Sequence, residues 1–404
     1  MTENRVSSAE GMKKEALPRR DWILLPMLAL LTVVFLAGST ELVARKTFSE
    51  STTGIEKCMV VNDPSTGVRG IPNTVCWEKS PESPNIEFRF NGCGHRAGME
   101  CEPKPAGTYR IVMMGSSVAM GMRVRQNESF AALLPVELSK LTGRRVELYN
   151  ESMGWGFPHS TALRFNQVLA AKPDMILWIL TPMDVEKTTV VVAPVDVIGD
   201  DQSISLAVKA WRRAKEAVAA ESLSTAMGTV FSRTRTALML RHYLYASQSQ
   251  YVKAFLAGSD DETGYLKGAW SDEWKNRLIS FDADAAEMER QAHAAGIPFV
   301  AAYVPERAQV AMISIGEWPA GFDPYKLDDE LRSTIVRYGG IYTDILPQFK
   351  TIAHPERLYF AVDGHPNPAG HAVISGLLAK SITSDALSAL KAAQPELVSA
   401  EKGR

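Results

Sequence analysis

Short apolar runs alternate with longer segments of helical periodicity over residues 108–385. A wholly apolar run such as residues 175–180 is typical of a strand buried on both faces of a parallel sheet. Strands that alternate with helices predict an α/β fold with a doubly wound parallel sheet. The predicted strands are residues 111–114, 146–149, 175–180, 298–304 and 341–345.

Apolar positions at helical spacing predict the segments between these strands to be helices. A largely helical insertion is expected at about residues 188–268, between two strand–helix units. Residues 386–404 are expected to form a C-terminal tail. The predicted helices are residues 130–141, 161–171, most of 203–258, 270–295 and a last one after residue 367.

The N-terminal part contains a run long enough to cross a membrane. Residues 22–40 carry no charge, and a helix of that length rises roughly 28 Å, close to the ~30 Å hydrocarbon core. A transmembrane anchor is predicted at residues 22–42. The excess of positive charge before it predicts that residues 1–21 are cytoplasmic and that the rest lies on the periplasmic side of the inner membrane. A cleaved signal peptide and a buried core helix are the alternatives.

All four cysteines lie in the segment that follows, residues 43–107. An even number of cysteines in one loop-rich stretch of an exported chain predicts two disulfides. Sequential pairing is the simplest of three connectivities: Cys58 with Cys76, and Cys93 with Cys101. A zinc site is the alternative, although the spacing contains no CxxC pair. We expect residues 43–107 to form an irregular, disulfide-stapled lead-in.

Composition and charge exclude several classes of protein. With 46% hydrophobic and 22% charged residues the chain has the composition of a globular protein. Its formal net charge of −2 gives no basic face for a nucleic-acid partner. The sequence has no HExxH motif, no P-loop and no dinucleotide-binding glycine motif, so no metal and no cofactor is predicted.

Ser117 stands in the turn after the first predicted strand, within Gly115-Ser116-Ser117-Val118-Ala119-Met120-Gly121. Ligands of parallel α/β sheets bind beyond the carboxyl ends of the strands. A serine in the first helical turn also presents a backbone N–H that can stabilise an oxyanion. The alternative interpretation is that Ser116 and Ser117 only cap a helix.

His365 stands in a loop just before the last predicted helix, whose start is indicated by Asn367 and Pro368. A neutral imidazole at this place can take a proton from a serine hydroxyl, and a nearby carboxylate can fix its tautomer. Asp363 is the nearest candidate for that carboxylate, with Asp184 and Asp344 as alternatives.

These two segments resemble the SGNH (GDSL-like) hydrolase superfamily, with its flavodoxin-like fold. In that family a GDSxxxG block supplies the nucleophile, and a late block supplies the acid and the base. The resemblance implies Ser117 as nucleophile, His365 as base and Asp363 as its acidic partner. This chain departs from the pattern because Ser116 replaces the aspartate before the nucleophile, and because one residue instead of two separates Asp363 from His365.

The resemblance is weaker at the two middle blocks. It implies an oxyanion N–H from Gly154, with Gly156 as the alternative register, and it places Asp184 in the third block. The asparagine that donates to the oxyanion in this family is replaced by Met183. The loss of such a donor typically lowers turnover by about 10²–10³-fold.

Similar membrane-anchored proteins of this superfamily remove or add O-acetyl groups of exported polysaccharides. The resemblance therefore implies a serine esterase or O-acyltransferase that acts on an ester or an acylated carbohydrate. A transferase outside the cytoplasm would require an acyl donor from a membrane partner. The alternative is a non-catalytic binding or assembly protein of a cell-envelope polysaccharide system, which the replacements at positions 116 and 183 favour.

Overall fold

A five-stranded parallel sheet forms the centre of the computed structural model, which describes residues 20–49, 54–188, 234–258, 263–386 and 390. The strand order is β6-β5-β7-β8-β9, and every neighbouring pair is parallel. This is the doubly wound order predicted from the alternation of strands and helices. The strands are β5 (Thr108–Gly115), β6 (Arg145–Asn150), β7 (Met175–Leu180), β8 (Phe299–Tyr303) and β9 (Ile341–Thr343).

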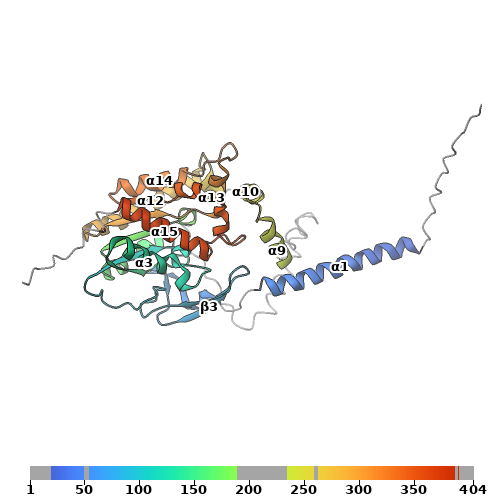
Figure 1. Ribbon diagram of the computed structural model, residues 1–404, viewed down its shortest axis with the longest axis horizontal. Coiled ribbons are helices and arrows are strands. Elements are labelled where there is room, and N and C mark those ends of the chain that lie inside the picture. Colours follow the sequence, from blue (N-terminus) through green and yellow to red (C-terminus); the bar gives the residue numbers. More distant parts are fainter. Residues whose placement is uncertain (1–19, 50–53, 189–233, 259–262, 387–389, 391–404) are drawn as a thin grey trace, which may run out of the picture.

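Helices cover both faces of this sheet (Figure 1). On one face, α3 (Phe130–Thr142) and α15 (Pro368–Asp385) pack on alternate side chains of the strands, such as Ile111 and Leu177. On the other face, α12 (Asp272–Ala294) and α14 (Lys326–Arg337) pack on the intervening ones. Every residue of β7 is buried, which explains why this strand has no polar position.

The predicted helix at residues 161–171 is wrong in one respect, because the structure has two short helices there. These are α4 (Pro158–Leu163) and α5 (Phe165–Ala170), and the break lies at Arg164. The Arg164 side chain is buried, and its Nη1 donates to the carbonyl of Glu151 at 2.6 Å. A buried guanidinium needs such acceptors, and turning it inward interrupts the helix.

Further elements connect these layers. The short helices after β5 and β7 are α2 (Ser117–Met120) and α6 (Pro182–Glu186). Of the expected insertion, the structure describes α9 (Arg235–Leu244) and α10 (Gln248–Leu256), while residues 189–233 and 259–262 lie outside the described part. Helix α13 (Arg307–Ile315) follows β8. The 3₁₀ turns are Ile55–Cys58, Gln126–Glu128, Gly264–Leu266, Pro347–Thr351 and Pro355–Leu358.

The lead-in is more regular than expected, because it forms two antiparallel hairpins. Strand β1 (Met59–Asp63) pairs with β2 (Gly67–Gly70), and β3 (Val75–Lys79) pairs with β4 (Asn85–Arg89). These strands have only four or five residues each, and the turns between them contain Pro and Ser, so the apolar pattern along the chain is weak. They enclose a small core of their own that includes Ile86, Phe88 and Phe90.

Two disulfides join parts of the lead-in, with the predicted sequential pairing. Cys58 pairs with Cys76, which links the start of β1 to β3. Cys93 pairs with Cys101 in the loop after β4. No cysteine of the chain is left free. The zinc alternative is therefore not supported.

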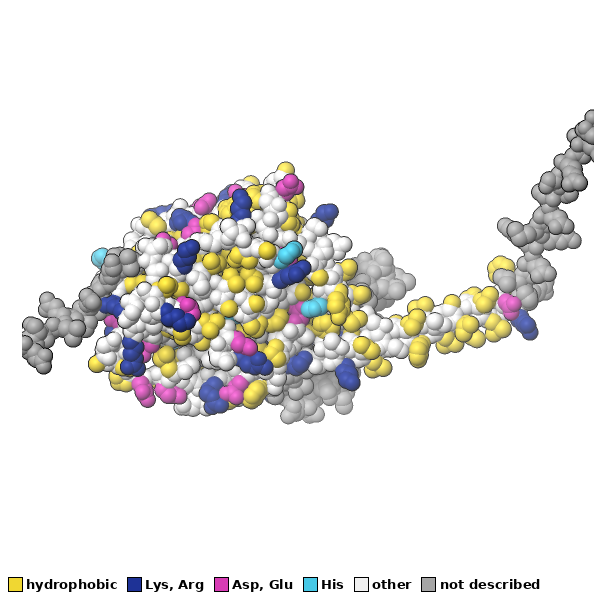
Figure 2. All heavy atoms as spheres, in the orientation of Figure 1, with side chains coloured by type: hydrophobic (Ala, Val, Ile, Leu, Met, Phe, Trp, Pro, Cys, Tyr) yellow, Lys and Arg dark blue, Asp and Glu magenta, His cyan; other side chains and the backbone are white. Residues whose placement is uncertain are grey.

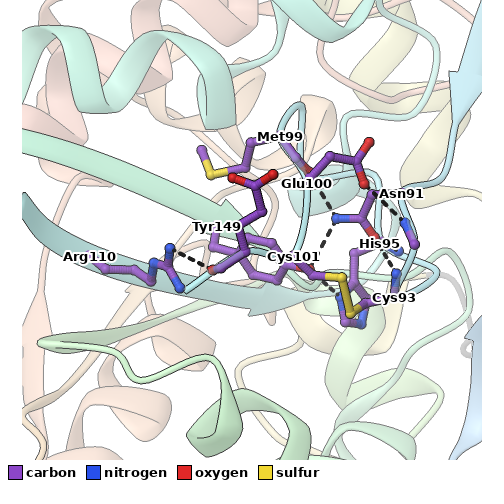
Figure 3. Close-up of a disulfide and its surroundings, with 10 residues drawn as sticks. Asn91, Cys93, His95, Met99, Glu100, Cys101, Arg110 and Tyr149 are labelled. Atoms are coloured by element: carbon purple, nitrogen blue, oxygen red, sulfur yellow. Dashed lines mark hydrogen bonds between the residues drawn. A yellow bond between two sulfur atoms is a disulfide. The ribbon is translucent and has the colours of Figure 1, made fainter. Parts of the chain in front are cut away.

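The second disulfide closes a loop that is bonded to the central sheet (Figure 3). Asn91 donates from Nδ2 to the hydroxyl of Tyr149, a residue of β6, at 3.0 Å. His95 Nδ1 lies 3.0 Å from the same hydroxyl. Burial lowers the pKa of His95 to about 3, so its ring is neutral. The lead-in is thus attached to the sheet by a neutral, buried hydrogen-bond network.

Helix α1 (Asp21–Thr47) extends from the body and is apolar on all sides (Figures 1 and 2). It is long and apolar enough to span a membrane, and the residues of its apolar part are exposed. Together with the two disulfides, this helix is consistent with a single-pass membrane protein whose larger part is extracytoplasmic. The predicted cytoplasmic segment lies outside the described residues up to position 19, as does nearly all of the predicted C-terminal tail.

We predict that the native chain contains no reactive thiol. Alkylation of the denatured, unreduced protein should modify none of its four cysteines, and alkylation after reduction should modify all four. Mass spectrometry of the intact protein counts the modifications. Four alkylated cysteines without reduction would contradict both disulfides and the oxidising compartment that they indicate.

Candidate active site

Ser117 is placed by a sharp turn at the carboxyl end of β5. Gly115 ends this strand at φ +154°, and a Cβ there would lie 2.7 Å from both the Cβ of Ala119 and the carbonyl oxygen of Ile179. Only glycine fits this conformation and this space. The chain therefore turns at once into α2, in which Ser117 is the first helical residue.

His365 reaches Ser117 from the other end of the described chain. Its Nε2 lies 2.9 Å from Ser117 Oγ, across 248 residues of sequence. The loop that carries it is closed by its own backbone: Phe360 N donates to His365 O at 2.9 Å, and Gly364 N donates to Phe360 O at 3.1 Å. Asn367 then caps α15, as its sequence context predicted.

Asp363 completes a continuous hydrogen-bonded chain. Its Oδ1 lies 2.7 Å from His365 Nδ1, so Nδ1 donates and Nε2 is left to accept from the serine hydroxyl. The other two carboxylates considered for this position lie elsewhere: Asp344 pairs with Arg332, and Asp184 bonds to Thr181. The three side chains thus have the order and spacing that nucleophilic catalysis requires of a hydroxyl, an imidazole and an orienting carboxylate.

Arg123 binds the second oxygen of Asp363. Its Nε donates to Asp363 Oδ2 at 2.9 Å, and its Nη1 is paired with Glu78 of β3. Burial by itself would raise the pKa of Asp363, but the hydrogen bond and charge of His365, followed by the charge of Arg123, outweigh it and lower this pKa well below its ordinary value. Asp363 is therefore an anion.

The backbone of Arg123 is in the left-handed region, at φ +68°. This conformation costs a non-glycine residue about 1–2 kcal/mol, which the two carboxylate partners of Arg123 offset. No sequence motif marks Arg123, so it was missed in the sequence analysis. The only hint is its place two residues after Gly121, the last residue of the block around Ser117.

The lead-in supplies a second contact to the same loop through Glu82. One oxygen of this carboxylate accepts from the backbone N–H groups of Val362 and Asp363, at 2.9 and 2.8 Å. The other lies 2.6 Å from Nδ1 of His242, a residue of α9. Glu78 and Glu82, neither of which sequence reasoning identified, thus connect the hairpin segment to the loop that carries Asp363 and His365.

Ser117 is the first residue of α2, and the first N–H groups of a helix have no partner within it. The two predicted glycine donors are placed differently. Gly154 is buried, and its N–H points to Met120 Sδ at 3.0 Å. The N–H of Gly156 donates to the carbonyl of Met153 at 2.9 Å. A weak thioether acceptor can be exchanged for an oxyanion more readily than a carbonyl can, so Gly154 stays the better prediction of the two.

Asp184 has a local structural role in α6. Its Oδ2 accepts from the N–H and the hydroxyl of Thr181, at 2.8 and 2.7 Å, which caps the helix. It is fully buried, and this burial raises its pKa to about 6 against the opposing hydrogen bonds of Thr181 and Ser116. Met183, in contrast, is partly exposed and lines the cavity described next.

A cavity of about 300 Å³ opens beside Ser117 and His365. Its walls come from the catalytic loops, from Val304 to Arg307 after β8, and from α9 and α10. Aromatic side chains form much of the lining. The charged lining residues are Arg241, Glu306, Arg307 and Asp363. Arg307 is buried and donates to three backbone carbonyls, so it fixes the wall. The aromatic lining residues are Tyr245, Tyr251, Phe255 and Tyr359.

Two other histidines, His371 and His159, do not line this cavity. His371 is buried, stacks on Phe130 and accepts from the Phe130 N–H at 3.2 Å. His159 has an exposed side chain that lies 3.3 Å from Asp284. Among the described residues there is no group of three or more His, Cys, Asp or Glu side chains that could hold a metal ion.

Comparisons with known proteins find similarity only among solved structures. No family model and no curated protein matches the chain. An acetyl xylan esterase is 10% identical with a TM-score of 0.36, over 68% of this chain and 99% of its own. A Parabacteroides merdae protein described as a GDSL-like lipase is 10% identical with a TM-score of 0.36, over 70% and 97%. A lipase/acylhydrolase from Enterococcus faecalis is 12% identical with a TM-score of 0.32, over 68% and 96%.

The TM-scores quoted are all below 0.5, so the chemistry rests on this chain's own geometry.

We predict that Arg123 acts as a positioning residue. Arg123→Gln removes a charge-assisted hydrogen bond to Asp363, which should lower kcat/KM for a short-chain ester about tenfold. The loss should fall on kcat and leave KM nearly unchanged, because Arg123 does not line the cavity. Arg125→Gln is the matched control, because Arg125 is exposed and pairs with Glu128. An unchanged kcat in Arg123→Gln would show that Arg123 does not position Asp363 and His365.

We predict that Asp184 makes stability fall as the pH rises. Its pKa is 3.8 in the unfolded chain and about 6 in the folded protein. Its contribution to the free energy of unfolding is therefore fully present below pH 3.8 and is lost as the pH rises through 6. This difference corresponds to about 3 kcal/mol. Asp184→Asn keeps an acceptor for Thr181 but cannot ionise.

Relative to wild type, Asp184→Asn should therefore gain unfolding free energy between pH 4 and pH 7, measured by denaturant titration. The exposed Asp329→Asn is the control. If the free energies of unfolding of wild type and Asp184→Asn change with pH in parallel, the raised pKa of Asp184 is refuted.

Proposed function

We propose that this chain is a membrane-anchored, extracytoplasmic serine esterase or O-acyltransferase of the SGNH type. Ser117 is the nucleophile, His365 the general base and Asp363 the residue that orients the imidazole. The single observation that carries the proposal is the continuous chain of contacts at 2.9 and 2.7 Å from Ser117 Oγ through His365 to Asp363.

The reaction begins when Ser117 Oγ attacks the carbonyl carbon of an acyl ester while His365 Nε2 accepts the hydroxyl proton. The carbonyl oxygen becomes an oxyanion, which the N–H of Ser117 and a second donor, proposed as Gly154, stabilise. Collapse of this intermediate breaks the bond to the alcohol, and His365 returns its proton to the leaving oxygen. The product of this half-reaction is an acyl-Ser117 ester and a free alcohol.

In the second half-reaction, His365 takes a proton from the acceptor, whose oxygen attacks the acyl group. Water as acceptor gives a carboxylic acid, and a sugar hydroxyl gives a new ester. In both cases His365 returns the proton to Ser117 Oγ. The anion of Asp363 stabilises the imidazolium that forms twice in this cycle, without taking the proton itself.

The substrate class proposed is an O-acyl group, in particular O-acetyl, on a carbohydrate. The cavity of about 300 Å³ is lined mainly by aromatic and aliphatic side chains, which suits a small acyl group next to a sugar ring. An anchor in the inner membrane, with the body on the periplasmic side, would bring the site to exported glycans. The same anchor would bring the site to a membrane partner that supplies the acyl donor.

A second candidate is a binding or assembly protein that has lost efficient chemistry. Met183 at an oxyanion position and the contact between Gly154 and Met120 favour it. The intact contact between Ser117 and His365 opposes it, because a binding protein does not require an activated serine.

We predict that Ser117→Ala abolishes turnover of p-nitrophenyl acetate while the melting temperature stays nearly unchanged, since loss of one hydroxyl in a turn removes little packing. His365→Ala should reduce turnover as strongly, because nucleophile and base act as a unit. Asp363→Ala should have the mildest effect of the three.

Ser116→Ala is the matched control, because Ser116 is the neighbouring serine and is buried. It should retain turnover. Wild-type turnover in Ser117→Ala would place the nucleophile elsewhere, and no turnover in wild type would favour the binding protein.

A further inference from the structure

Helix α9 begins beside the last two turns of helix α1, just after the uncharged run of α1. The carboxylate of Glu41 accepts from the backbone N–H groups of Arg235 and Thr236, at 3.2 and 2.9 Å, and from the Thr236 hydroxyl at 2.9 Å. These are first-turn N–H groups, which a helix cannot satisfy by itself. Glu41 directly follows the uncharged run that ends at Thr40. The start of α9 is therefore fixed at the point where α1 would leave the hydrocarbon of a membrane.

Three large side chains of α9 form an exposed apolar face. Leu240, Tyr243 and Leu244 are 45%, 67% and 56% exposed, and their spacing puts them on one side of the helix. The opposite side faces the body, where His242 contacts Glu82 and packs edge-on against Phe48. A helix with one apolar side, a tyrosine on that side and cationic residues beside it is typical of the membrane interface.

The geometry keeps this face close to the membrane. In Figure 1, α9 runs across the axis of α1 and not along it, as a helix in the plane of a bilayer would. Figure 2 shows hydrophobic side chains along α1 and on the adjoining edge of the body. If α9 were perpendicular to the bilayer, Leu244 would lie only about 12 Å farther from the hydrocarbon than Thr236, because a helix rises about 1.5 Å per residue. The headgroup layer on each side of the hydrocarbon is itself roughly 5–7 Å thick.

The same helix forms part of the catalytic cavity. Arg241 and Tyr245, from α9 and its end, line the cavity, as do Tyr251 and Phe255 of α10. A surface that lies against the exposed face of α9 is therefore separated from the cavity by this one helix.

We propose that the face formed by Leu240, Tyr243 and Leu244 rests on the lipid bilayer, so that the cavity takes acyl esters presented at the membrane surface. The anchor places this face beside lipid at a high effective concentration, so three side chains are sufficient for a stable contact. The occupant of the face is the bilayer itself, and not a second copy of this chain. The statement about substrate rests on the proposed function, but the contact with lipid does not.

The contact is tested in the full-length protein in vesicles of phosphatidylcholine and phosphatidylglycerol. All native cysteines are in disulfides, so Leu244→Cys can be labelled with an environment-sensitive fluorophore. Val336→Cys is the matched control: Val336 is equally exposed, at 56%, on α14, which lies far from α1 in Figure 1. Lipids with a nitroxide at the headgroup or high on the acyl chain should quench the label at position 244 several-fold more than the label at position 336. Equal quenching at the two positions would overturn the proposal.

A second measurement separates this proposal from the proposed function. Leu240→Gln combined with Leu244→Gln should lower turnover of the acetyl ester of a long-chain alcohol embedded in the vesicles several-fold. The same double variant should leave turnover of soluble p-nitrophenyl acetate unchanged, since neither residue lines the cavity. Equal turnover of the embedded ester by variant and wild type would contradict delivery at the interface. If the wild type turns over neither ester, the proposed function fails, and the quenching at position 244 still decides the contact with lipid.

Discussion

The negative charge of Asp363 is the feature on which the geometry of the site depends. A carboxylate that is largely removed from water must be paired and hydrogen-bonded, or it takes up a proton. Here one oxygen binds the imidazole of His365 and the other binds the guanidinium of Arg123. An ionised Asp363 fixes the tautomer in which His365 Nε2 faces Ser117. The orientation of His365 thus depends on the groups that pair with Asp363.

These partners make the lead-in part of the site, although it precedes the sheet in sequence. Glu78 pairs with Arg123, and Glu82 binds the backbone of Val362 and Asp363. The disulfide between Cys58 and Cys76 links the start of β1 to β3, the strand that carries Glu78. Through His242 the same segment contacts α9, which is in turn bonded to the end of α1. Helix α1, the lead-in and the loop that carries Asp363 and His365 therefore form one connected set of contacts.

Much of the fold could be predicted from the sequence because the buried strands are continuous apolar runs. Gly115, and Asn367 with Pro368, also mark the turns that carry Ser117 and His365, and the two side chains meet in the structure. The hairpins of the lead-in were missed, since their strands are short and only half buried. The break at Arg164 was missed because it depends on where one guanidinium finds acceptors.

The partners of the triad could not be predicted either. Arg123, Glu78 and Glu82 belong to no local pattern, and their contacts arise only when segments far apart in sequence meet. The N–H groups that would bind the oxyanion are also difficult to predict from the sequence. A glycine register can be predicted from a motif, but the direction of an N–H depends on backbone dihedrals that the motif does not specify. The contact of Gly154 with Met120 is of this kind.

The most direct test of the account is whether Ser117 is an activated nucleophile. The full-length protein is treated with a fluorophosphonate probe, and the modified peptide is identified by mass spectrometry. The account predicts one adduct, on Ser117, that is lost when the base is removed in His365→Ala. An unmodified Ser117, or an adduct on another residue, would contradict it.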